Sequence, residues 1–311
     1  MKKVLFIVGL FLFTSVSGQV KTKEEVIELY KSLYASSELS KMPWVEGTGC
    51  SPGSLPDHIY KKVENRINFF RVVNGLSEIK VDPTYNKEAQ AAAYWCFANN
   101  TLSHAPGKST KCFSEAAYTG CNTSCLGFSD YKWYPNTAFI SGFMMDFGES
   151  NYYIGHRRCI LSTTLETVSY GATATTESLI VMKGMYKTVP DKPEYVAYPW
   201  HGYVPVDLIY PKWSFSIPRS NDVDFSKAKV KMTDGDGNDI AVKMYDQYSY
   251  QDPTLVWQAK GMYDPKELEY AENKLEEKGY LNKKITVKIT GVVVNGKTKN
   301  YEYFVEPLKI D

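Results

Sequence analysis

The first half of the chain places apolar residues at the spacing of an α-helix. Thr22 and Glu25 form a capping box, which predicts a short helix that ends near residue 36. After a proline-containing loop, apolar residues recur every three or four positions from Asp57, and Gly75 terminates this second run. The pattern therefore predicts two helices in this part of the chain.

Two further helices are expected before the pattern changes. Asp82-Pro83 caps an alanine-rich helix that runs to about Cys96. Asn136 can cap a later helix that stops at Gly148. A loop rich in glycine, proline and serine holds His104 and separates the two helices.

The period then changes from that of a helix to that of a strand. Apolar and polar residues alternate over 168–172, and an apolar run follows over 179–182. Thr176-Glu177-Ser178 is the predicted turn between them, so the segment is expected to be a β-hairpin. The open face of an antiparallel pair must be covered by another layer, and the preceding helices can supply that layer. The pattern therefore predicts an α+β domain.

Prolines crowd the stretch around residues 190–205, which predicts a linker. Strand patterns dominate beyond it, and Asn295-Gly296 is a strong hairpin turn. One helix is expected from Asp264 to Gly279. We therefore expect a β-sandwich over 195–311 with one inserted helix. The strands are predicted at 228–232, 240–242, 285–294 and 301–305.

The start of the chain has the composition of a secretory signal. Lys2 and Lys3 precede an apolar run over 4–13, which is too short to span a bilayer, and small residues follow over 16–18. No other segment is apolar enough for a transmembrane helix. The formal net charge of +1 gives no electrostatic case for binding nucleic acid. A secreted, extracellular protein is the expectation.

An even number of cysteines in a secreted protein predicts disulfides, although the sequence leaves their pairing open. A zinc knuckle is the alternative for the cluster after His104. This cluster lacks the paired C-x2-C spacing of a zinc knuckle, and an oxidising compartment disfavours the free thiolates that zinc needs. The six cysteines are Cys50, Cys96, Cys112, Cys121, Cys125 and Cys159.

Two histidines are each paired along the chain with an acid. His104 precedes Glu115, and Asp146 precedes His156. Two imidazoles and two carboxylates can form a metal site or an acid/base site if the chain brings them together. The sequence contains no H-E-x-x-H motif that would place two ligands on one helix face, so their spacing alone leaves convergence open.

Three motifs resemble those of the CAP superfamily (cysteine-rich secretory proteins, antigen five, pathogenesis-related proteins). Residues 66–76 look like its first-helix motif, Leu102-Ser103-His104 ends the alanine-rich helix, and Gly155-His156-Arg157 is similar to microbial members. The resemblance covers about 57–185. It implies an α-β-α sandwich with a large open cleft that holds two histidines and two acids.

The resemblance also implies roles for individual residues. His104 and His156 match the two histidines, and Glu115 matches the first acid. Asp146 matches the second acid, with Glu149 as the alternative.

The expected organisation has four parts, and the later strands resemble a β-rich extension found after CAP domains in some secreted microbial proteins. The fold class is α+β: a CAP-type α-β-α sandwich followed by an Ig-like β-sandwich. The parts are a signal peptide over 1–18, an N-terminal helical segment over 19–48, a CAP domain over 49–192 and a β-rich C-terminal domain over 193–311.

Three functions are compatible with these observations. The first is a binding protein whose four cleft residues hold Zn²⁺ or Mg²⁺ weakly beside a sterol, a fatty acid or an extracellular protein, as the resemblance implies. The second is a metal-assisted or His/Glu hydrolase, but no G-x-S-x-G nucleophile motif accompanies the four residues. The third is an adhesive protein that acts through its C-terminal domain. The missing nucleophile favours binding over catalysis.

Other motifs favour structural roles. We expect Arg157-Arg158 to close its loop through a salt bridge rather than to bind an anion. The segment 234–239 is expected to be a strand turn rather than a calcium loop, because it lacks the glycine and glutamate of such loops. Trp213 and Trp257 are expected in the sandwich core rather than in a carbohydrate platform.

Overall fold

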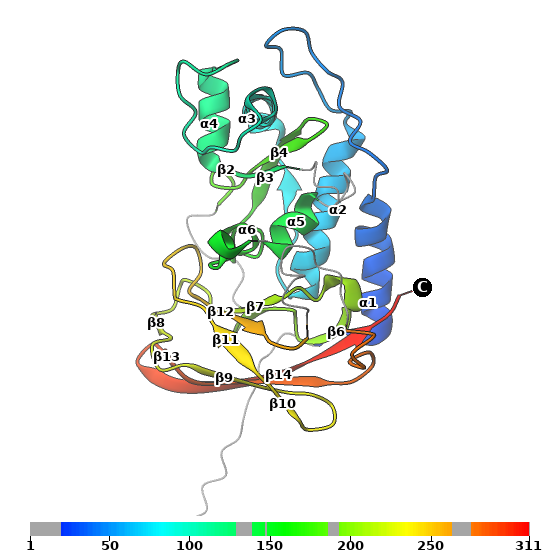
Figure 1. Cartoon of the computed structure of the whole chain (residues 1–311), viewed down its shortest axis with the longest axis vertical. Helices are drawn as coiled ribbons and strands as arrows, with labels where there is room; N and C mark the ends of the chain where they lie inside the picture. Colours follow the sequence, from blue (N-terminus) through cyan, green and yellow to red (C-terminus); the bar gives the residue numbers. More distant parts are fainter. Residues whose placement is uncertain (1–19, 129–138, 147, 186–192, 263–274, 311) are drawn as a thin grey trace, which may run out of the picture.

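The structure is a computed structural model of the chain. It describes residues 20–128, 139–146, 148–185, 193–262 and 275–310. The predicted signal peptide, the Asn136 cap and most of the helix expected from Asp264 lie outside these residues. Within them, no helix is long and apolar enough to cross a membrane. The described chain forms a helix-rich N-terminal region and an all-β C-terminal region. In Figure 1 the N-terminal region lies mainly above the C-terminal region.

A four-stranded sheet lies at the centre of the N-terminal region, with strand order β1-β3-β4-β2. β1 pairs with β3 in parallel, and the other neighbours are antiparallel. The strands are β1 Lys80–Val81, β2 Ser124–Phe128, β3 Thr167–Ala172 and β4 Thr176–Ile180.

Helices cover both faces of this sheet (Figure 1). Successive strand side chains point to opposite faces: the Thr176 hydroxyl donates to the Ala93 carbonyl of α3, whereas Glu177 accepts from the Tyr170 hydroxyl on the other face. α3 Asn86–Asn99 and α4 Glu115–Thr123 pack on the Thr176 face. α2 His58–Val73, α5 Phe139–Met145 and α6 Gly155–Ile160 belong to the opposite layer.

The N-terminal segment packs beside α2. Its capping box is confirmed, because the Thr22 hydroxyl accepts from the Glu25 amide and the Glu25 carboxylate accepts from the Thr22 amide. The α-helix is shorter than predicted, since a π-helical turn and a 3-10 turn replace its last part. The elements are α1 Lys23–Leu29, η1 Tyr30–Tyr34 and η2 Ala35–Ser37. Two further 3-10 turns of this region are η3 Pro83–Tyr85 and η4 Glu149–Asn151.

The predicted hairpin exists, but its predicted turn is wrong. β3 and β4 are joined by residues 173–175, and Thr176, Glu177 and Ser178 are buried strand residues. The Thr173 hydroxyl makes the turn by accepting from the backbone amides of residues 175 and 176. The prediction placed these three polar residues in a solvent-exposed turn, whereas the helices on both faces of the sheet bury them.

The C-terminal region contains two sheets. A six-stranded sheet has the order β10-β9-β13-β14-β6, with β8 on β13, and a four-stranded sheet has the order β11-β12-β7-β5. The strands are β5 Val196–Tyr198, β6 Gly202–Pro205, β7 Lys212–Ser216, β8 Val223–Asp224, β9 Lys229–Thr233, β10 Asp239–Ile240, β11 Val242–Met244, β12 Thr254–Ala259, β13 Ile285–Val294 and β14 Lys297–Leu308. The short 3-10 helix η5 Val206–Leu208 follows β6.

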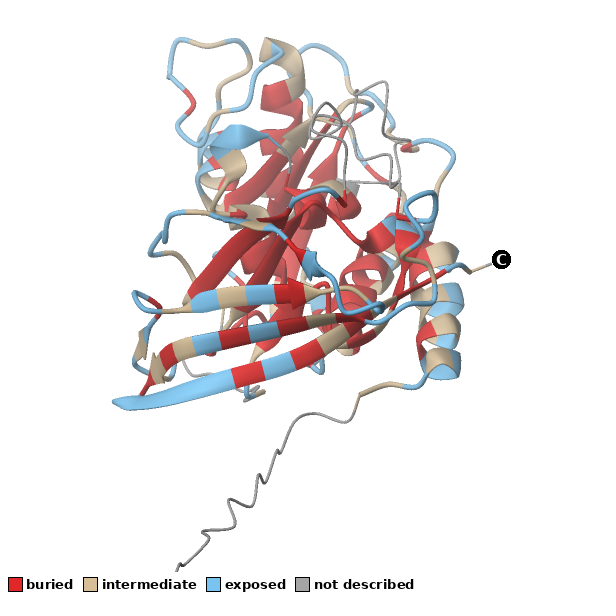
Figure 2. Cartoon of the chain, turned by 60° about the horizontal axis from the view of Figure 1, so that its bottom comes forward, coloured by how far each residue is buried: buried red, intermediate tan, exposed pale blue. Residues whose placement is uncertain are grey.

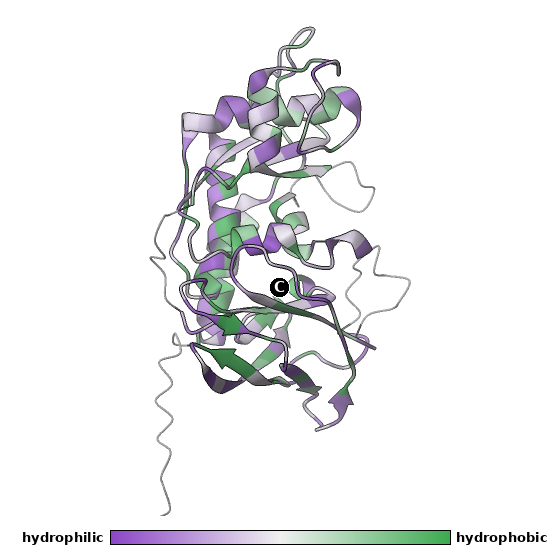
Figure 3. Ribbon diagram, turned by 90° about the vertical axis from the view of Figure 1, so that its left-hand side faces the viewer, coloured by the Kyte–Doolittle hydropathy of each residue, from purple (hydrophilic) through white to green (hydrophobic). Residues whose placement is uncertain are grey.

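The all-β character predicted for this region is confirmed, but an Ig-like strand order is not. β14 pairs with β6 in parallel, and the chain leaves one sheet for the other at Ala241, between β10 and β11. Along β13 and β14 buried and exposed residues alternate, as Figure 2 shows for the large sheet. Hydrophobic residues are concentrated on the strands of this region (Figure 3).

The core prediction for the two tryptophans is confirmed. Trp213 and Trp257 face each other across β7 and β12, and both are fully buried. The Trp257 indole N–H lies 3.1 Å from the sulfur of Met232 on β9, so it connects the two sheets. The predicted turn over 234–239 is also confirmed, because the Asp234 carboxylate accepts from the backbone amides of Asp236 and Asn238.

The expectation that all six cysteines form disulfides is met in part. Cys50 and Cys112 are bonded, whereas the other four are buried thiols in this structure. These four lie in two contacting pairs, Cys96 with Cys121 and Cys125 with Cys159.

We predict that Gly120→Ala destabilises the fold by about 2 kcal/mol, the usual cost of overpacking. A Cβ at Gly120 would lie 2.2 Å from the Glu88 carbonyl oxygen, which α3 holds in place. Gly142→Ala on α5 is the matched control, because a Cβ there meets nothing within 4 Å. The control should be neutral or stabilising by up to about 1 kcal/mol. Thermal unfolding of the two variants checks this; equal melting temperatures would contradict it.

Candidate functional site

Asp146 and His156 are in direct contact. The His156 ring nitrogen Nδ1 lies 3.0 Å from Asp146 Oδ1, and the His156 backbone amide donates to Oδ2 at 2.9 Å. A carboxylate can only accept, so Nδ1 carries the proton and Nε2 is left as the free ring nitrogen. The Arg157 amide also donates to Oδ2, at 3.3 Å. Asp146 thus caps the first turn of α6 and orients the imidazole.

The backbone around this pair adopts left-handed conformations that side chains rarely tolerate. Asp146 has a φ of +56°, and Ile154, the residue before α6, has a φ of +48°. For a β-branched residue such as isoleucine this conformation is strained, and strain of this kind concentrates at functional sites. Ile154 is fully buried, so the surrounding packing holds it in place.

The electrostatics of the pair favour a charged imidazole. Burial lowers the pKa of His156, but the Asp146 charge and hydrogen bond outweigh that effect, so the net pKa lies above its ordinary value. The ring also packs against Phe143 at a centroid distance of 4.9 Å. The His156 side chain remains 28% exposed, so its free nitrogen can reach a ligand.

His104 is fixed in a different way. Its Nδ1 lies 2.8 Å from the Cys121 carbonyl oxygen, which makes Nδ1 the donor and leaves Nε2 free here as well. Cys121 lies near the end of α4, whereas Glu115 is its first residue. Six residues of helix correspond to about 9 Å along the axis. Glu115 is exposed, and its side chain has no hydrogen bond or ion pair to the described residues.

The two candidates for the second acid lie in different surroundings. Asp146 is buried in contact with His156, whereas Glu149 lies exposed in the 3-10 turn η4. Among the residues that the structure describes, no three His, Cys, Asp or Glu side chains are arranged to hold a metal ion. Within the described part of the chain, the four residues proposed for Zn²⁺ or Mg²⁺ therefore do not supply three ligands to one point in this structure.

The C-terminal region contributes a buried cation to this site. The Lys212 ammonium group, from β7, donates to the carbonyl oxygens of Asp146, Gly148 and Asn151 at 2.6, 2.8 and 3.0 Å. Burial lowers the pKa of Lys212 to about 8, although the nearby Asp146 charge opposes this. The backbone that carries Asp146 is thus held by a residue more than sixty positions away.

Arg157 joins the two regions from the opposite direction. Its guanidinium donates to the Met144 and Met145 carbonyls of α5 and to the Lys212 carbonyl of β7. It also lies over the Tyr198 ring of β5, 4.4 Å from the centroid.

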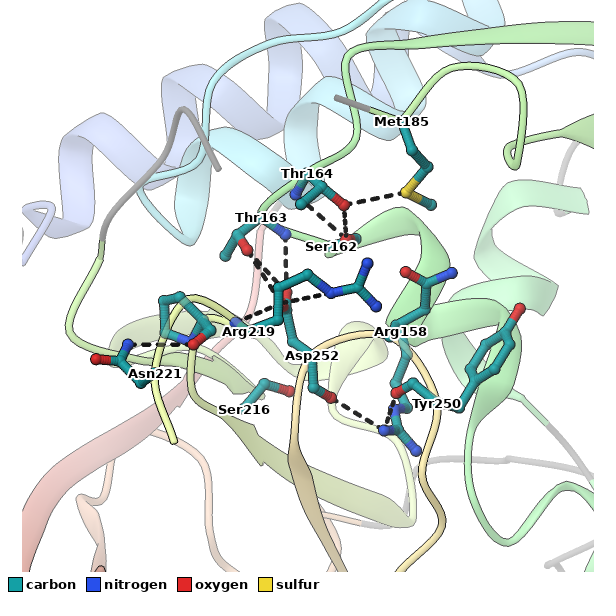
Figure 4. Close-up of polar contacts among 12 residues, drawn as sticks. Arg158, Ser162, Thr163, Thr164, Met185, Ser216, Arg219, Asn221, Tyr250 and Asp252 are labelled. Carbon is teal, nitrogen blue, oxygen red and sulfur yellow. Dashed lines mark hydrogen bonds and ion pairs between the residues drawn. The ribbon is translucent and has the colours of Figure 1, made fainter. Parts of the chain in front are cut away.

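Arg158 reaches the loop between β11 and β12. It donates to the carbonyl oxygens of Tyr248, Tyr250 and Asp252. Figure 4 shows the contacts of Arg158 with Tyr250 and Asp252. The contacts that the structure gives for the Arg157 and Arg158 side chains differ from the expected salt bridge: both side chains are buried, and both donate to backbone carbonyl oxygens. The sequence shows the charges but not that a second region packs over them.

The Asp252 carboxylate completes this contact (Figure 4). It accepts from the Thr163 amide and hydroxyl of the N-terminal region and from the Arg219 amide of the C-terminal region. Asp252 is buried, and these donors from both sides satisfy its charge. The neighbouring Gln251 also has a left-handed φ, +51°.

Four tyrosines lie close together beside α6, the helix that carries His156, and we call them the tyrosine rim: Tyr152, Tyr153, Tyr248 and Tyr250. The Tyr153 ring lies 4.7 Å from that of Tyr248 and 6.3 Å from that of Tyr250. Tyr152 packs edge-on against Tyr153 at 5.6 Å. Tyr250 Oη lies 3.1 Å from the Cys159 sulfur, one helical turn beyond His156. The Tyr248 residue is 48% exposed.

The sequence patterns did not indicate Lys212, Asp252 or the tyrosine rim. Tyr152-Tyr153 is separated from the Gly155-His156 motif only by Ile154, and this proximity is a signal of the rim in the sequence. The tyrosines at 245, 248 and 250 form a second cluster along the chain. Nothing in the sequence pairs these two clusters, because only the packing of the two regions brings them together.

We predict that Asp146→Asn lowers the pKa of His156 below its ordinary value, because burial then acts without an opposing charge. In the wild type the folded pKa is raised, so the pair stabilises the fold fully below the unfolded value, about 6.5. This contribution is lost as pH rises through the folded pKa. NMR titration of the imidazole resonances and melting temperatures across that window check this; an unchanged midpoint would contradict it.

We predict that Lys212→Met costs about 3 kcal/mol at pH 7, because three carbonyl groups lose their buried donor. In the wild type, the folded state releases the Lys212 proton from about pH 8 while the unfolded chain keeps it to about pH 10.5. Wild-type stability should therefore gain a contribution with rising pH in this window that the variant lacks. Denaturation at pH 7 and pH 10 measures both effects. The exposed Lys297→Met is the control, and equal losses would contradict the prediction.

Comparison with known proteins identifies a family for the helix-rich N-terminal region. Residues 64–181 match the family model described as CAP, the cysteine-rich secretory protein family. Neither the curated proteins nor the solved structures provide a match to the chain. The match begins within α2, ends just after β4 and includes all four candidate residues of the site. Residues 64–181 of this chain therefore form a CAP domain of the cysteine-rich secretory protein family.

Proposed function

We propose that the protein is secreted and binds an extracellular protein through the tyrosine rim beside His156. The observation that carries the proposal is the rim itself, in which tyrosines of the CAP domain and of the C-terminal region pack against one another and Tyr248 is exposed. Such rings offer a large, amphipathic contact area at a low cost in conformational entropy, and tyrosine is enriched at protein interfaces.

His156 adds a polar anchor to this surface. Its Nδ1 proton is held by Asp146, so Nε2 faces a ligand in a defined orientation. In the charged form favoured by the raised pKa, Nε2 donates a hydrogen bond to a carbonyl or carboxylate group. A ligand would suit this arrangement if it offers a hydrogen-bond acceptor to His156 and also contacts the rings of the tyrosine rim.

The aromatic rings of the rim and the His156 donor suit a protein ligand. Apolar small molecules are held in concave sites of roughly 300–1,000 Å³. A cavity of about 250 Å³ lies away from the rim in the C-terminal region, and it is bordered by Glu194, Lys299 and Tyr301. Its volume is below that range, and charged side chains line it.

Secretion is part of the same proposal. The apolar start of the chain has the composition of a signal peptide, and the Cys50–Cys112 disulfide is typical of oxidising compartments. A function in hydrolysis has less support. Asp146 and His156 form half of a catalytic arrangement, but the adjacent thiol of Cys159 is buried and contacts Cys125.

We predict that Tyr248→Ala weakens ligand binding about tenfold or more, because it removes the most exposed ring of the rim. Tyr118→Ala is the matched control, since Tyr118 is also well exposed, at 40%, but lies on α4. Mass spectrometry of molecules retained from native medium identifies the ligand, and titration of the purified ligand gives the affinities.

Three outcomes would contradict the proposal. The first is an equal affinity of the two variants, and the second is a wild type that carries a stoichiometric lipid or metal ion instead of a protein. Turnover of a peptide or ester library that is lost in His156→Gln would favour hydrolysis.

A further inference from the structure

Four cysteines outside the Cys50–Cys112 bond form two pairs of contacting thiols. In the first pair, Cys96 of α3 and Cys121 of α4 share a hydrogen bond between their side chains. In the second, Cys125 of β2 and Cys159 of α6 do the same. All four residues are at most 3% exposed.

The first pair lies where α3 and α4 approach most closely. Gly120 permits this approach, because its missing Cβ would collide with the Glu88 carbonyl oxygen. The Cys121 sulfur lies 4.0 Å from the Ala92 carbonyl oxygen, one helical turn before Cys96. The backbone therefore holds the Cys96 and Cys121 side chains against each other.

The second pair connects the central sheet to the helix of the site. Cys125 pairs with Leu179 of β4, and its side chain meets Cys159 on the sheet face that carries α6. The Tyr250 hydroxyl lies 3.1 Å from the Cys159 sulfur and closes the surroundings of the pair. The contact with Cys125 lowers the pKa of Cys159, whereas the same contact raises that of Cys125. Cys159 is therefore the better thiolate of the two.

We propose that Cys96 forms a disulfide with Cys121 and that Cys125 forms one with Cys159 in the mature protein. The Cys50–Cys112 bond is typical of an oxidising compartment, where contacting thiols are also oxidised. In each pair one thiolate attacks the disulfide of a thiol–disulfide oxidoreductase, and the second thiolate resolves the mixed disulfide. Each pair loses two protons and two electrons, and the oxidoreductase disulfide is reduced to a dithiol.

The two bonds would fix both histidines of the site. Cys125–Cys159 ties α6, which carries His156, to β2. Cys96–Cys121 ties α3 to the end of α4, where the Cys121 carbonyl accepts from His104. The proposal is independent of the ligand, and it stands or falls separately from the proposed function.

Peptide mapping of the wild-type protein tests the proposal directly. The protein is secreted through an oxidising compartment, alkylated without reduction and digested. We expect peptides linked through Cys96 and Cys121 and through Cys125 and Cys159. Alkylated thiols at these positions, or any other pairing, would overturn the proposal.

Thermal unfolding provides a second test that isolates the two new bonds. A Cys50→Ser/Cys112→Ser variant lacks the disulfide already present, so a reductant acts only on the other four cysteines. We expect reduction to lower its melting temperature by about 5–10 °C. No effect of the reductant in this variant would contradict the two bonds. The mapping experiment remains decisive if the variant does not fold.

Discussion

Three cationic side chains are buried where the CAP domain meets the C-terminal region, and backbone carbonyl groups solvate them. Arg157, Arg158 and Lys212 make these contacts in both directions across the junction. A buried charge without partners is strongly unfavourable, so neither region can separate from the other without exposing unsatisfied donors and acceptors. The position of α6, and with it that of His156, depends on this exchange of hydrogen bonds.

The same contacts explain how strained backbone persists around the site. Asp146, Ile154 and Gln251 adopt left-handed conformations, and each lies beside one of the buried cations or their acceptors. Strain of this kind survives only where the surroundings determine the conformation in more than one way. Here Lys212 holds the carbonyl of Asp146 while the amides of α6 hold its carboxylate. The orientation of the imidazole is thus fixed by two regions of the chain together.

Local features of the sequence were predicted well where they depend on neighbouring residues. The capping box at Thr22, the stop at Gly75 and the Asn295-Gly296 turn are examples, since short-range hydrogen bonds and φ values set them. The prediction placed the hairpin turn at Thr176 and Glu177 because polar residues usually mark exposed turns. In the structure both residues are buried in β4 between two layers of helices.

For the site, the family resemblance implied that Asp146 and His156 lie together, whereas their spacing alone left this open. The role of Lys212 could not be foreseen, because an isolated lysine in a strand pattern carries no sign that three distant carbonyls will surround it. For the same reason, the tyrosine rim cannot be derived from the chain alone.

The contacts between Arg158 and the loop that joins β11 to β12 allow the exposed side chains of that loop to vary. Arg158 recognises the loop between β11 and β12 through the carbonyl oxygens of Tyr248, Tyr250 and Asp252. Every residue type has a carbonyl group, so this recognition does not depend on the side chains at 248 and 249. Substitutions there change the chemistry of the exposed surface and leave the attachment of the loop intact. The junction therefore separates the sequence requirements of folding from those of recognition, as the framework of an antibody does for its loops.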